Sequence, residues 1–184
     1  MTDSVIVTIV RFVNLLFAGL FAGFLVTVLV IESTLRSFDA AVYTQVRLVE
    51  LVHLDDLATA SLVPTLTTTV VLVFFGAKVR GRTFWLTLTA LLLLVVVFAT
   101  SLLVNVPINT DQLAWSVHAP PAGWASVRDR WQIAHAVRTV AALLAFAGLS
   151  AAATHKSSVI RLTAHGSPAG GTGRSPDHPV RSSV

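Results

Sequence analysis

The sequence contains no cysteine and very little charge. Without cysteine the chain can form no disulfide, thiolate metal site, iron–sulfur cluster or thiol nucleophile, so any metal would be held by His, Asp, Glu or backbone ligands. Only 12% of the residues are charged, whereas a soluble domain has about 25%. Together with 54% hydrophobic residues and a mean hydropathy of +0.78, this composition indicates a membrane protein.

Sequence motifs of the common soluble enzymes are also missing. The chain has no glycine-rich phosphate loop, no Gly-x-Ser-x-Gly elbow, no His-Glu-x-x-His and no dinucleotide-binding fingerprint. The net charge is +4, but the basic residues lie at the ends of apolar stretches and in the C-terminal tail rather than along one soluble face. Nucleic acid is therefore not an expected partner.

Four apolar stretches are long enough to cross a bilayer, which takes about 20 helical residues. They cover approximately residues 5–31, 57–79, 84–104 and 131–153. The predicted fold class is therefore all-α, a transmembrane four-helix bundle formed by residues 1–156. Residues 157–184 are rich in Ser, Gly, Pro, His and Arg, and they are expected to form a disordered tail.

Positive charge predicts the orientation of the spans. Lys78, Arg80 and Arg82 form a tight basic turn between the second and third stretches. Basic loops stay in the cytoplasm, and four spans then place both termini and the tail there too. We expect a multi-pass plasma-membrane protein whose first partner is the lipid bilayer. Small residues at 18–23 of the first span would permit close helix contacts, including those of a homo-oligomer.

Polar side chains at membrane depth are costly and mark candidate functional positions. In this sequence they gather toward the end of the bundle opposite the basic turn, on or beside all four stretches. The residues are Asn14, Glu32, Glu50, His53, Asn105, Asn109, Arg128, Trp131, His135 and Arg138. Because facing helices of a bundle build pockets from such side chains, we expect a polar pocket at the extracytoplasmic end.

Spacing groups some of these residues further. Trp131, His135 and Arg138 share one face of the fourth stretch, and Arg128 extends that face by a turn. Plainer interpretations remain open: Arg138 would form a structural ion pair with Glu32, and the Asn-Val-Pro-Ile-Asn run would simply end a helix. Three tryptophans near span ends would form an interfacial aromatic belt. They are Trp115, Trp124 and Trp131.

A metal site is a further hypothesis. Glu50 and His53 have the Glu-x-x-His spacing that di-metal carboxylate bundles use. Glu32 and His135 would complete a site for iron, copper or manganese. A pair at this spacing also recurs by chance, and a His hydrogen-bonded at a helix end explains it equally well. A metal-dependent membrane oxidase acting on another small molecule therefore stays an alternative.

The segment between the third and fourth stretches carries a recognisable pattern. Asn-Val-Pro-Ile-Asn at 105–109 is followed by Trp124 and then by Arg-Trp-Gln-Ile-Ala-His-Ala-Val-Arg at 130–138. This pattern, with four spans and a first span rich in small residues, resembles the anthrone oxygenase-like family of four-helix membrane proteins. The resemblance covers roughly residues 5–150.

The resemblance implies a monooxygenase, independent of flavin and haem, that uses O₂ to convert a small apolar aromatic such as an anthrone into a quinone in an aromatic polyketide pathway. An anthrone methylene is acidic because its anion is an aromatic enolate. Such a reaction needs a base and an oxyanion stabiliser. His135 is the expected base, because imidazole titrates near neutrality. The expected oxyanion ligands are Arg138, Asn105 and Asn109, and the expected substrate contacts are Trp131, Trp124, Asn14 and Arg128.

A non-catalytic role is the third alternative. The chain would then be a membrane partner or assembly subunit, and its polar cluster would only fix the packing of the helices.

Overall fold

The computed structural model describes residues 5–163, with side chains as far as residue 155. Within these residues the chain is helical, and a single bridge between Ser116 and Ala119 is the only strand-like pairing. The elements are α1 (Val5–Leu35), α2 (Ala40–Glu50), α3 (Leu54–Gly76), α4 (Arg82–Thr100), the π-helical η1 (Ser101–Asn105), α5 (Val106–Gln112) and α6 (Trp124–Thr163).

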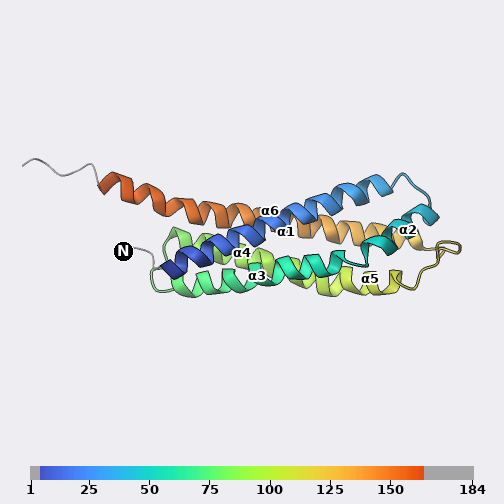
Figure 1. Ribbon diagram of the computed structural model, residues 1–184, viewed down its shortest axis with the longest axis horizontal. Coiled ribbons are helices and arrows are strands. Elements are labelled where there is room, and N and C mark those ends of the chain that lie inside the picture. Colours follow the sequence, from blue (N-terminus) through green and yellow to red (C-terminus); the bar gives the residue numbers. More distant parts are fainter. Residues whose placement is uncertain (1–4, 164–184) are drawn as a thin grey trace, which may run out of the picture.

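Four rods in this part of the chain are long and apolar enough to cross a membrane. They are α1, α3, the continuous run from Arg82 to Gln112, and α6 as far as His155. Helix α1 packs against α3 and α6, and α4 packs against α6 and α3, so that the four helices form a closed ring. Figure 1 shows α2 and α5 at one end of this bundle, while the N-terminal end of α1 and the α3–α4 turn lie at the other.

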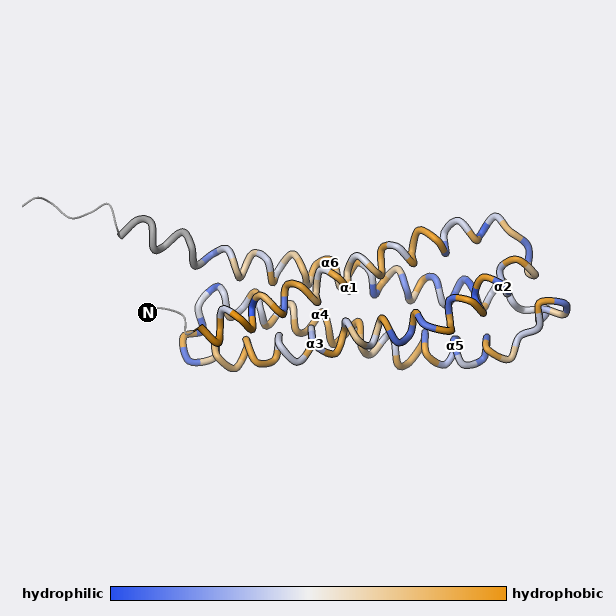
Figure 2. The backbone as a smooth tube through the Cα atoms, in the orientation of Figure 1, coloured by the Kyte–Doolittle hydropathy of each residue, from blue (hydrophilic) through white to orange (hydrophobic). Residues whose placement is uncertain are grey.

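The outside of the bundle carries many large apolar side chains, as expected for helices solvated by lipid. Phe74 and Leu103 are 75% and 77% exposed, whereas Leu25 and Val97 are fully buried. Figure 2 shows that the hydrophobic colouring runs along all four rods and that the hydrophilic segments lie mainly toward the two ends. An integral membrane protein therefore presents this surface to acyl chains.

Small residues allow the helices to approach one another closely, which drives packing where lipid removes the hydrophobic contrast. A Cβ atom at Gly19 of α1 would lie 3.3 Å from the ring of Phe146 on α6. Gly148 of α6 similarly lies against the backbone of Leu86 and the side chain of Ala90 on α4. These contacts set the points at which α6 crosses its two neighbours.

The third span is longer than the apolar run predicts. Pro107 lies in the first turn of α5, and the chain continues as helix to Gln112. The π-helical turn of η1 immediately precedes this proline, and a wider turn accommodates a residue that cannot join the regular i→i−4 ladder. The interpretation of the Asn-x-Pro-x-Asn run as a helix end is therefore wrong.

The predicted polar extension of span two is helical but not continuous with it. Asp39 caps α2 by accepting a hydrogen bond from the Val42 backbone N–H, and α2 ends at Glu50. A turn at residues 51–53 separates it from α3. At the other terminus α6 extends to Thr163, beyond residue 157 where the tail was expected to begin, and residues 164–184 of that tail lie outside the described residues.

Candidate functional site

Arg47 is the centre of a buried polar cluster at the α2–α5 end of the bundle. Its Nη1 donates to Glu50 Oε2 at 2.7 Å and lies 3.2 Å from Glu32 Oε1. Its Nε and Nη2 both donate to Gln112 Oε1, at 3.1 and 3.0 Å, and Nη2 also donates to Asn109 Oδ1 at 2.9 Å. One guanidinium thus joins α1, α2 and α5.

Two carboxylates share this single guanidinium. Glu32 is fully buried, and its Oε2 and backbone carbonyl both accept from Gln132 Nε2, at 2.9 and 2.8 Å. Glu50 is 8% exposed, and its Oε1 has no hydrogen-bond partner among the described side chains. Glu50 Oε1 is therefore a carboxylate oxygen without a hydrogen-bond donor in the described part of the chain, and Glu50 also interacts directly with the second carboxylate, Glu32.

Tyr43 fixes the orientation of the amide that faces Arg47. Its hydroxyl accepts from Gln112 Nε2 at 3.2 Å, which leaves Gln112 Oε1 pointing to the guanidinium. Burial raises the pKa of Tyr43 above its usual value of 10.0, and the nearby Glu32 charge raises it further. The phenol is therefore a neutral, structural member of the cluster.

Asn109 connects α3, α5 and α6. Its Oδ1 accepts from Trp131 Nε1 at 2.6 Å, and its Nδ2 donates to both oxygens of Asp55 at 3.0 Å. The Arg47 guanidinium lies over the Trp131 ring, 4.3 Å from its centroid. These contacts hold the indole in place between the carboxylate cluster and the next turn of α6.

That next turn carries His135 and Arg138. His135 Nε2 lies 3.0 Å from the Leu25 carbonyl oxygen. Because a carbonyl can only accept, Nε2 carries the ring proton, and Nδ1 accepts from Arg138 Nη2 at 2.8 Å. Arg138 Nη1 donates to Ser101 Oγ at 3.0 Å. Trp131 stacks on the imidazole, with ring centroids 4.8 Å apart and an interplanar angle of 7°.

The π-helical turn η1 supplies two of these polar contacts. It begins with Ser101, which binds Arg138, and it ends with Asn105, whose Nδ2 donates to the Trp131 carbonyl at 3.3 Å. Asn105 Oδ1 is buried without a hydrogen-bond partner in the described part of the chain. Single π turns inside α-helices are frequent at functional sites.

A small cavity of about 30 Å³ lies between these groups. Apolar side chains of α1 and of the α2–α3 junction form part of its wall. The polar lining residues are Arg47, Glu50, Asp55, Asn109, Trp131, His135 and Arg138. This space accommodates a molecule the size of water, whereas pockets for larger organic ligands are about 300–1,000 Å³. A tricyclic ligand would therefore have to displace part of the wall, and the turn at 51–53 is the break in helical structure closest to it.

Four of the residues expected at the catalytic or substrate site line this cavity. Asn109, Trp131, His135 and Arg138 line it, and Asn105 lies behind Trp131. The expected ion pair between Glu32 and Arg138 is wrong, because α2 folds over the end of the bundle and inserts Arg47 beside Glu32 instead.

Three expected substrate-contacting residues lie elsewhere. Asn14 is far along α1, where its Nδ2 donates to the Thr65 carbonyl and to Thr68 and Thr69 on α3. Eighteen residues of helix, or about 27 Å, separate it from Glu32. Trp124 packs on Tyr43 at 5.5 Å, outside the cavity. The Arg128 guanidinium lies 4.9 Å from the Trp124 ring centroid and pairs with Asp129.

The residues suggested for a metal do not converge. Glu32 and Glu50 both face Arg47, His53 is exposed at the start of α3, and both ring nitrogens of His135 are engaged. Among residues 5–155 no three His, Asp or Glu side chains form a group that could hold a metal ion. The donor set present does not fit the metal site suggested by the spacing of Glu50 and His53.

Several members of the cluster were missed from the sequence. These are Tyr43, Arg47, Ser101, Gln112 and Gln132. A signal existed for the first two: Tyr43, Arg47 and Glu50 are spaced to share one face of a helix that Asp39 caps. That face is buried because α2 lies across the end of the bundle rather than in solvent.

The comparisons with known proteins give one finding. The family model described as anthrone oxygenase matches residues 53–148, just over half of the chain. No curated protein and no solved structure matches. The matched range contains Asp55, Asn105, Asn109, Trp131, His135 and Arg138, whereas Glu32, Arg47 and Glu50 lie outside it. The chain belongs to the anthrone oxygenase family.

Proposed function

We propose that the protein is a membrane-embedded monooxygenase that uses O₂ to convert a small, apolar, reduced polycyclic aromatic of the anthrone type into a quinone. Family membership supports the reaction class. One observation supports the site: a buried cavity in the bundle is lined by a carboxylate with an unpartnered oxygen, Glu50, and by two guanidinium groups, Arg47 and Arg138.

The reaction requires proton removal and charge stabilisation. A base takes one proton from the methylene carbon, and the resulting enolate is electron-rich enough to react with O₂ directly. The base returns its proton to the peroxide anion formed on that carbon, and the hydroperoxide then loses the second methylene proton and hydroxide, which together leave as water, so that a carbonyl remains. One oxygen atom of O₂ thus enters the product and the other leaves as water. We propose that neither flavin nor haem takes part.

We assign proton removal to Glu50 rather than to His135. The Nδ1 lone pair of His135 is occupied by Arg138, and a proton taken up there would displace that hydrogen bond and stand beside a guanidinium charge. Glu50 keeps one oxygen on Arg47 at 2.7 Å and presents the other without a partner in the described part of the chain. His135 then acts as a positioning residue for Arg138.

The oxyanion is stabilised by groups fixed in advance. Arg138 lines the cavity and is held by His135 and Ser101, and its buried Nε has no partner among the described residues. Asn109 lines the same cavity and is oriented by Asp55 and Trp131. Preorganised donors of this kind in a water-poor site contribute strongly to transition-state stabilisation. Trp131 already stacks on His135, so it positions these groups rather than stacking on the substrate.

The cavity is proposed to face the extracytoplasmic side of the plasma membrane. The basic turn with Lys78, Arg80 and Arg82 lies at the opposite end of the bundle, and the positive-inside rule places such a turn in the cytoplasm. An apolar substrate would reach the site from the bilayer.

The test is turnover of an anthrone by the purified protein in lipid nanodiscs, followed as O₂ uptake and quinone absorbance. Glu50→Gln keeps the side-chain volume and an oxygen for Arg47 but removes the base, so turnover should fall about 10²–10⁴-fold. Asp129→Asn, an exposed carboxylate at the same end, is the matched control and should retain activity. Full activity in Glu50→Gln would refute the base assignment, whereas no O₂ uptake by the wild type with any anthrone would refute the oxygenase itself.

A further inference from the structure

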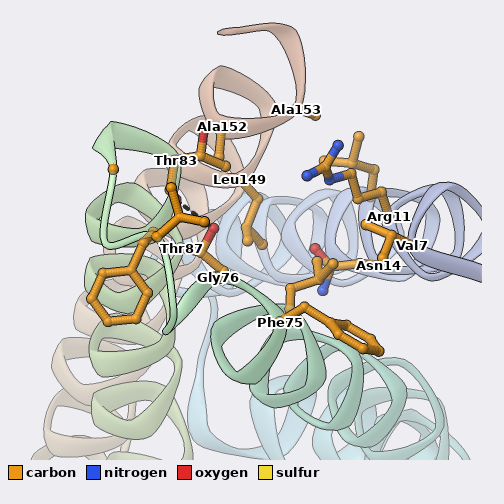
Figure 3. A pocket seen from close by; sticks show the side chains of 15 residues that line it. Val7, Arg11, Asn14, Phe75, Gly76, Thr83, Thr87, Leu149, Ala152 and Ala153 are labelled. Carbon is orange, nitrogen blue, oxygen red and sulfur yellow. Dashed lines mark hydrogen bonds between the residues drawn. The ribbon is translucent and has the colours of Figure 1, made fainter. Parts of the chain in front are cut away.

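A second and larger cavity, of about 260 Å³, lies at the basic-turn end of the bundle between α1, α3, α4 and α6. Figure 3 shows side chains of all four helices around it. Its floor is buried and its rim reaches the surface of the bundle. The floor includes Asn14, Thr87, Leu149 and Ala152, and the rim includes Arg11, Phe75 and Val79.

The cavity is separate from the proposed oxygenase site. Tightly packed apolar side chains fill the bundle between the two, among them Phe21, Leu94 and Ala145, each no more than 2% exposed. Along α1, ten residues separate Asn14 of one cavity from Phe24 of the other, which corresponds to about 15 Å. The larger cavity is therefore not an entrance to the smaller one.

The wall of this cavity is apolar and almost without charge. Arg11 at the rim is the charged side chain among the described lining residues, and it already has an interaction partner, so it gives no reason to expect an anionic ligand. Aliphatic and aromatic side chains form most of the remaining wall, including Leu15, Leu72 and Phe84. Because a charge is costly to bury in such surroundings, the complement of this cavity is a neutral and mainly apolar molecule.

The buried amide of Asn14 presents an acceptor to the cavity. Asn14 is 1% exposed, and its Nδ2 donates to the Thr65 carbonyl at 3.2 Å and to Thr68 and Thr69 Oγ1 at 2.9 and 2.8 Å. Figure 3 shows this nitrogen directed toward α3 and the amide oxygen directed away from it. All three described hydrogen bonds of the amide use its nitrogen, which leaves the lone pairs of Oδ1 for another donor.

Thr87 supplies a second acceptor. Its side chain is 4% exposed, and its Oγ1 donates to the Thr83 carbonyl at 2.8 Å, one turn earlier in α4. A hydroxyl that donates in this way still has lone pairs with which to accept. Two buried acceptors in an apolar wall therefore favour a ligand with a hydroxyl donor, and an acyl chain has none.

The volume and the aromatic lining favour a ring system. An apolar cavity of about 150 Å³ in another protein binds benzene, so a cavity of about 260 Å³ has room for fused rings. Phe75 and Phe84 line it, and aromatic side chains stabilise flat aromatic partners through offset or edge-to-face contacts. Mainly apolar walls with a few placed polar groups are typical of small-molecule sites.

We propose that this cavity is a second binding site, for a neutral phenol with fused aromatic rings. The hydroxyl donates to the acceptors of Asn14 and Thr87, and the rings lie among the apolar side chains of the four helices. The enol form of an anthrone is a phenol of this class, so the site holds such a molecule apart from the cavity in which it reacts. That link to the substrate rests on the proposed function, whereas the binding itself does not.

The test compares the binding of β-naphthol with that of its methyl ether, which has the same rings but no donor. Equilibrium dialysis measures the amount bound by the protein in nanodiscs beyond that taken up by empty nanodiscs. The wild type should bind β-naphthol roughly tenfold more tightly, since a hydrogen bond to a buried acceptor is lost in the ether. In Asn14→Leu/Thr87→Val, which lacks both acceptors, this ratio should fall to about one.

Thr110→Val is the matched control, because Thr110 is exposed at the other end of the bundle and its hydroxyl donates to the carbonyl four residues earlier, as that of Thr87 does. It should keep the wild-type ratio. Ala152→Phe fills the floor of the cavity and should abolish the binding of both probes. If neither cavity variant folds, the ratio in the wild type decides.

Equal affinity of the wild type for the two probes would overturn the proposal. So would an unchanged ratio in Asn14→Leu/Thr87→Val, or no binding beyond that of empty nanodiscs. The experiment needs no turnover, so its result is distinct from that of the oxygenase assay. A protein that binds β-naphthol as described but leaves an anthrone unchanged would refute the oxygenase and retain this site.

Discussion

Replacing Arg47 with Met removes the positive charge that Glu32 and Glu50 share. The side chain is 2% exposed, and its guanidinium makes contacts of 2.7 and 3.2 Å to the two carboxylates, besides hydrogen bonds to Asn109 and Gln112. Removing one partner of a buried ion pair costs about 3–5 kcal/mol, because the other charge is left uncompensated. We therefore expect Arg47→Met to lower the free energy of unfolding by about that amount.

Glu32→Gln should cost far less. It leaves one guanidinium with one carboxylate, at the 2.7 Å contact to Glu50, and it retains an acceptor for Gln132. For the same reason the double variant Arg47→Met/Glu32→Gln should be more stable than Arg47→Met alone, since one uncompensated charge is removed. Such non-additivity is the expected result for residues in one network.

The assay is reversible unfolding by SDS in mixed micelles, followed by circular dichroism. Arg36→Met is the control. Arg36 pairs with Asp129 through side chains 52% and 42% exposed and donates one hydrogen bond to Gln132 Oε1 at 2.9 Å, and such surface pairs contribute roughly 0–1 kcal/mol. If Arg47→Met were no more destabilising than Arg36→Met, or if the Arg47 and Glu32 variants were simply additive, the description of this cluster would be refuted.

Three further predictions concern single positions. Because burial raises the pKa of Tyr43, the stability contributed by its neutral phenol is complete below pH 10 and declines above it; absorbance at 295 nm should show no ionisation of this tyrosine near pH 10 until the protein unfolds. Asn14→Leu should weaken α1–α3 packing by about 1–2 kcal/mol, measured by SDS unfolding; an unchanged midpoint would contradict the hydrogen bonds described. Gly19→Leu should cost roughly 1–3 kcal/mol through overlap with Phe146. A Cβ atom at Gly23 meets no atom within 4 Å, so Gly23→Leu should be neutral; equal effects would refute the close crossing.

Hydropathy was sufficient to predict the four spans, because lipid tolerates only long apolar helices whose backbone groups are internally satisfied. It did not predict where the third span ends. Pro107 suggests a helix boundary in any sequence, and the π-helical turn that carries the chain past it depends on local geometry without a pattern in residue types. Sequence reasoning thus identified the rod but underestimated its length.

The site was predictable where polar residues lie within an apolar stretch. His135 and Arg138 stand out against the fourth span, and they do line the cavity with Asn109 and Trp131. Arg47 did not stand out, because α2 has the composition of a solvated surface helix. Only the packing of α2 across the end of the bundle shows that its polar face is inside.

Spacing alone was misleading for the metal hypothesis. Glu50 and His53 are three apart in sequence, but the turn at residues 51–53 places them on different elements, and His53 is exposed. The Glu-x-x-His pattern indicates shared ligation only when both residues belong to one helix.

The most direct test of the proposed oxygenase is a single turnover of an anthrone under ¹⁸O₂, with mass spectrometry of the quinone. The mechanism predicts one ¹⁸O atom per quinone in the newly formed carbonyl, O₂ consumption equal to product, and loss of this product in Glu50→Gln. A quinone whose new carbonyl oxygen comes from water, or an anthrone left unchanged by the wild type at the rate of the protein-free control, would contradict it.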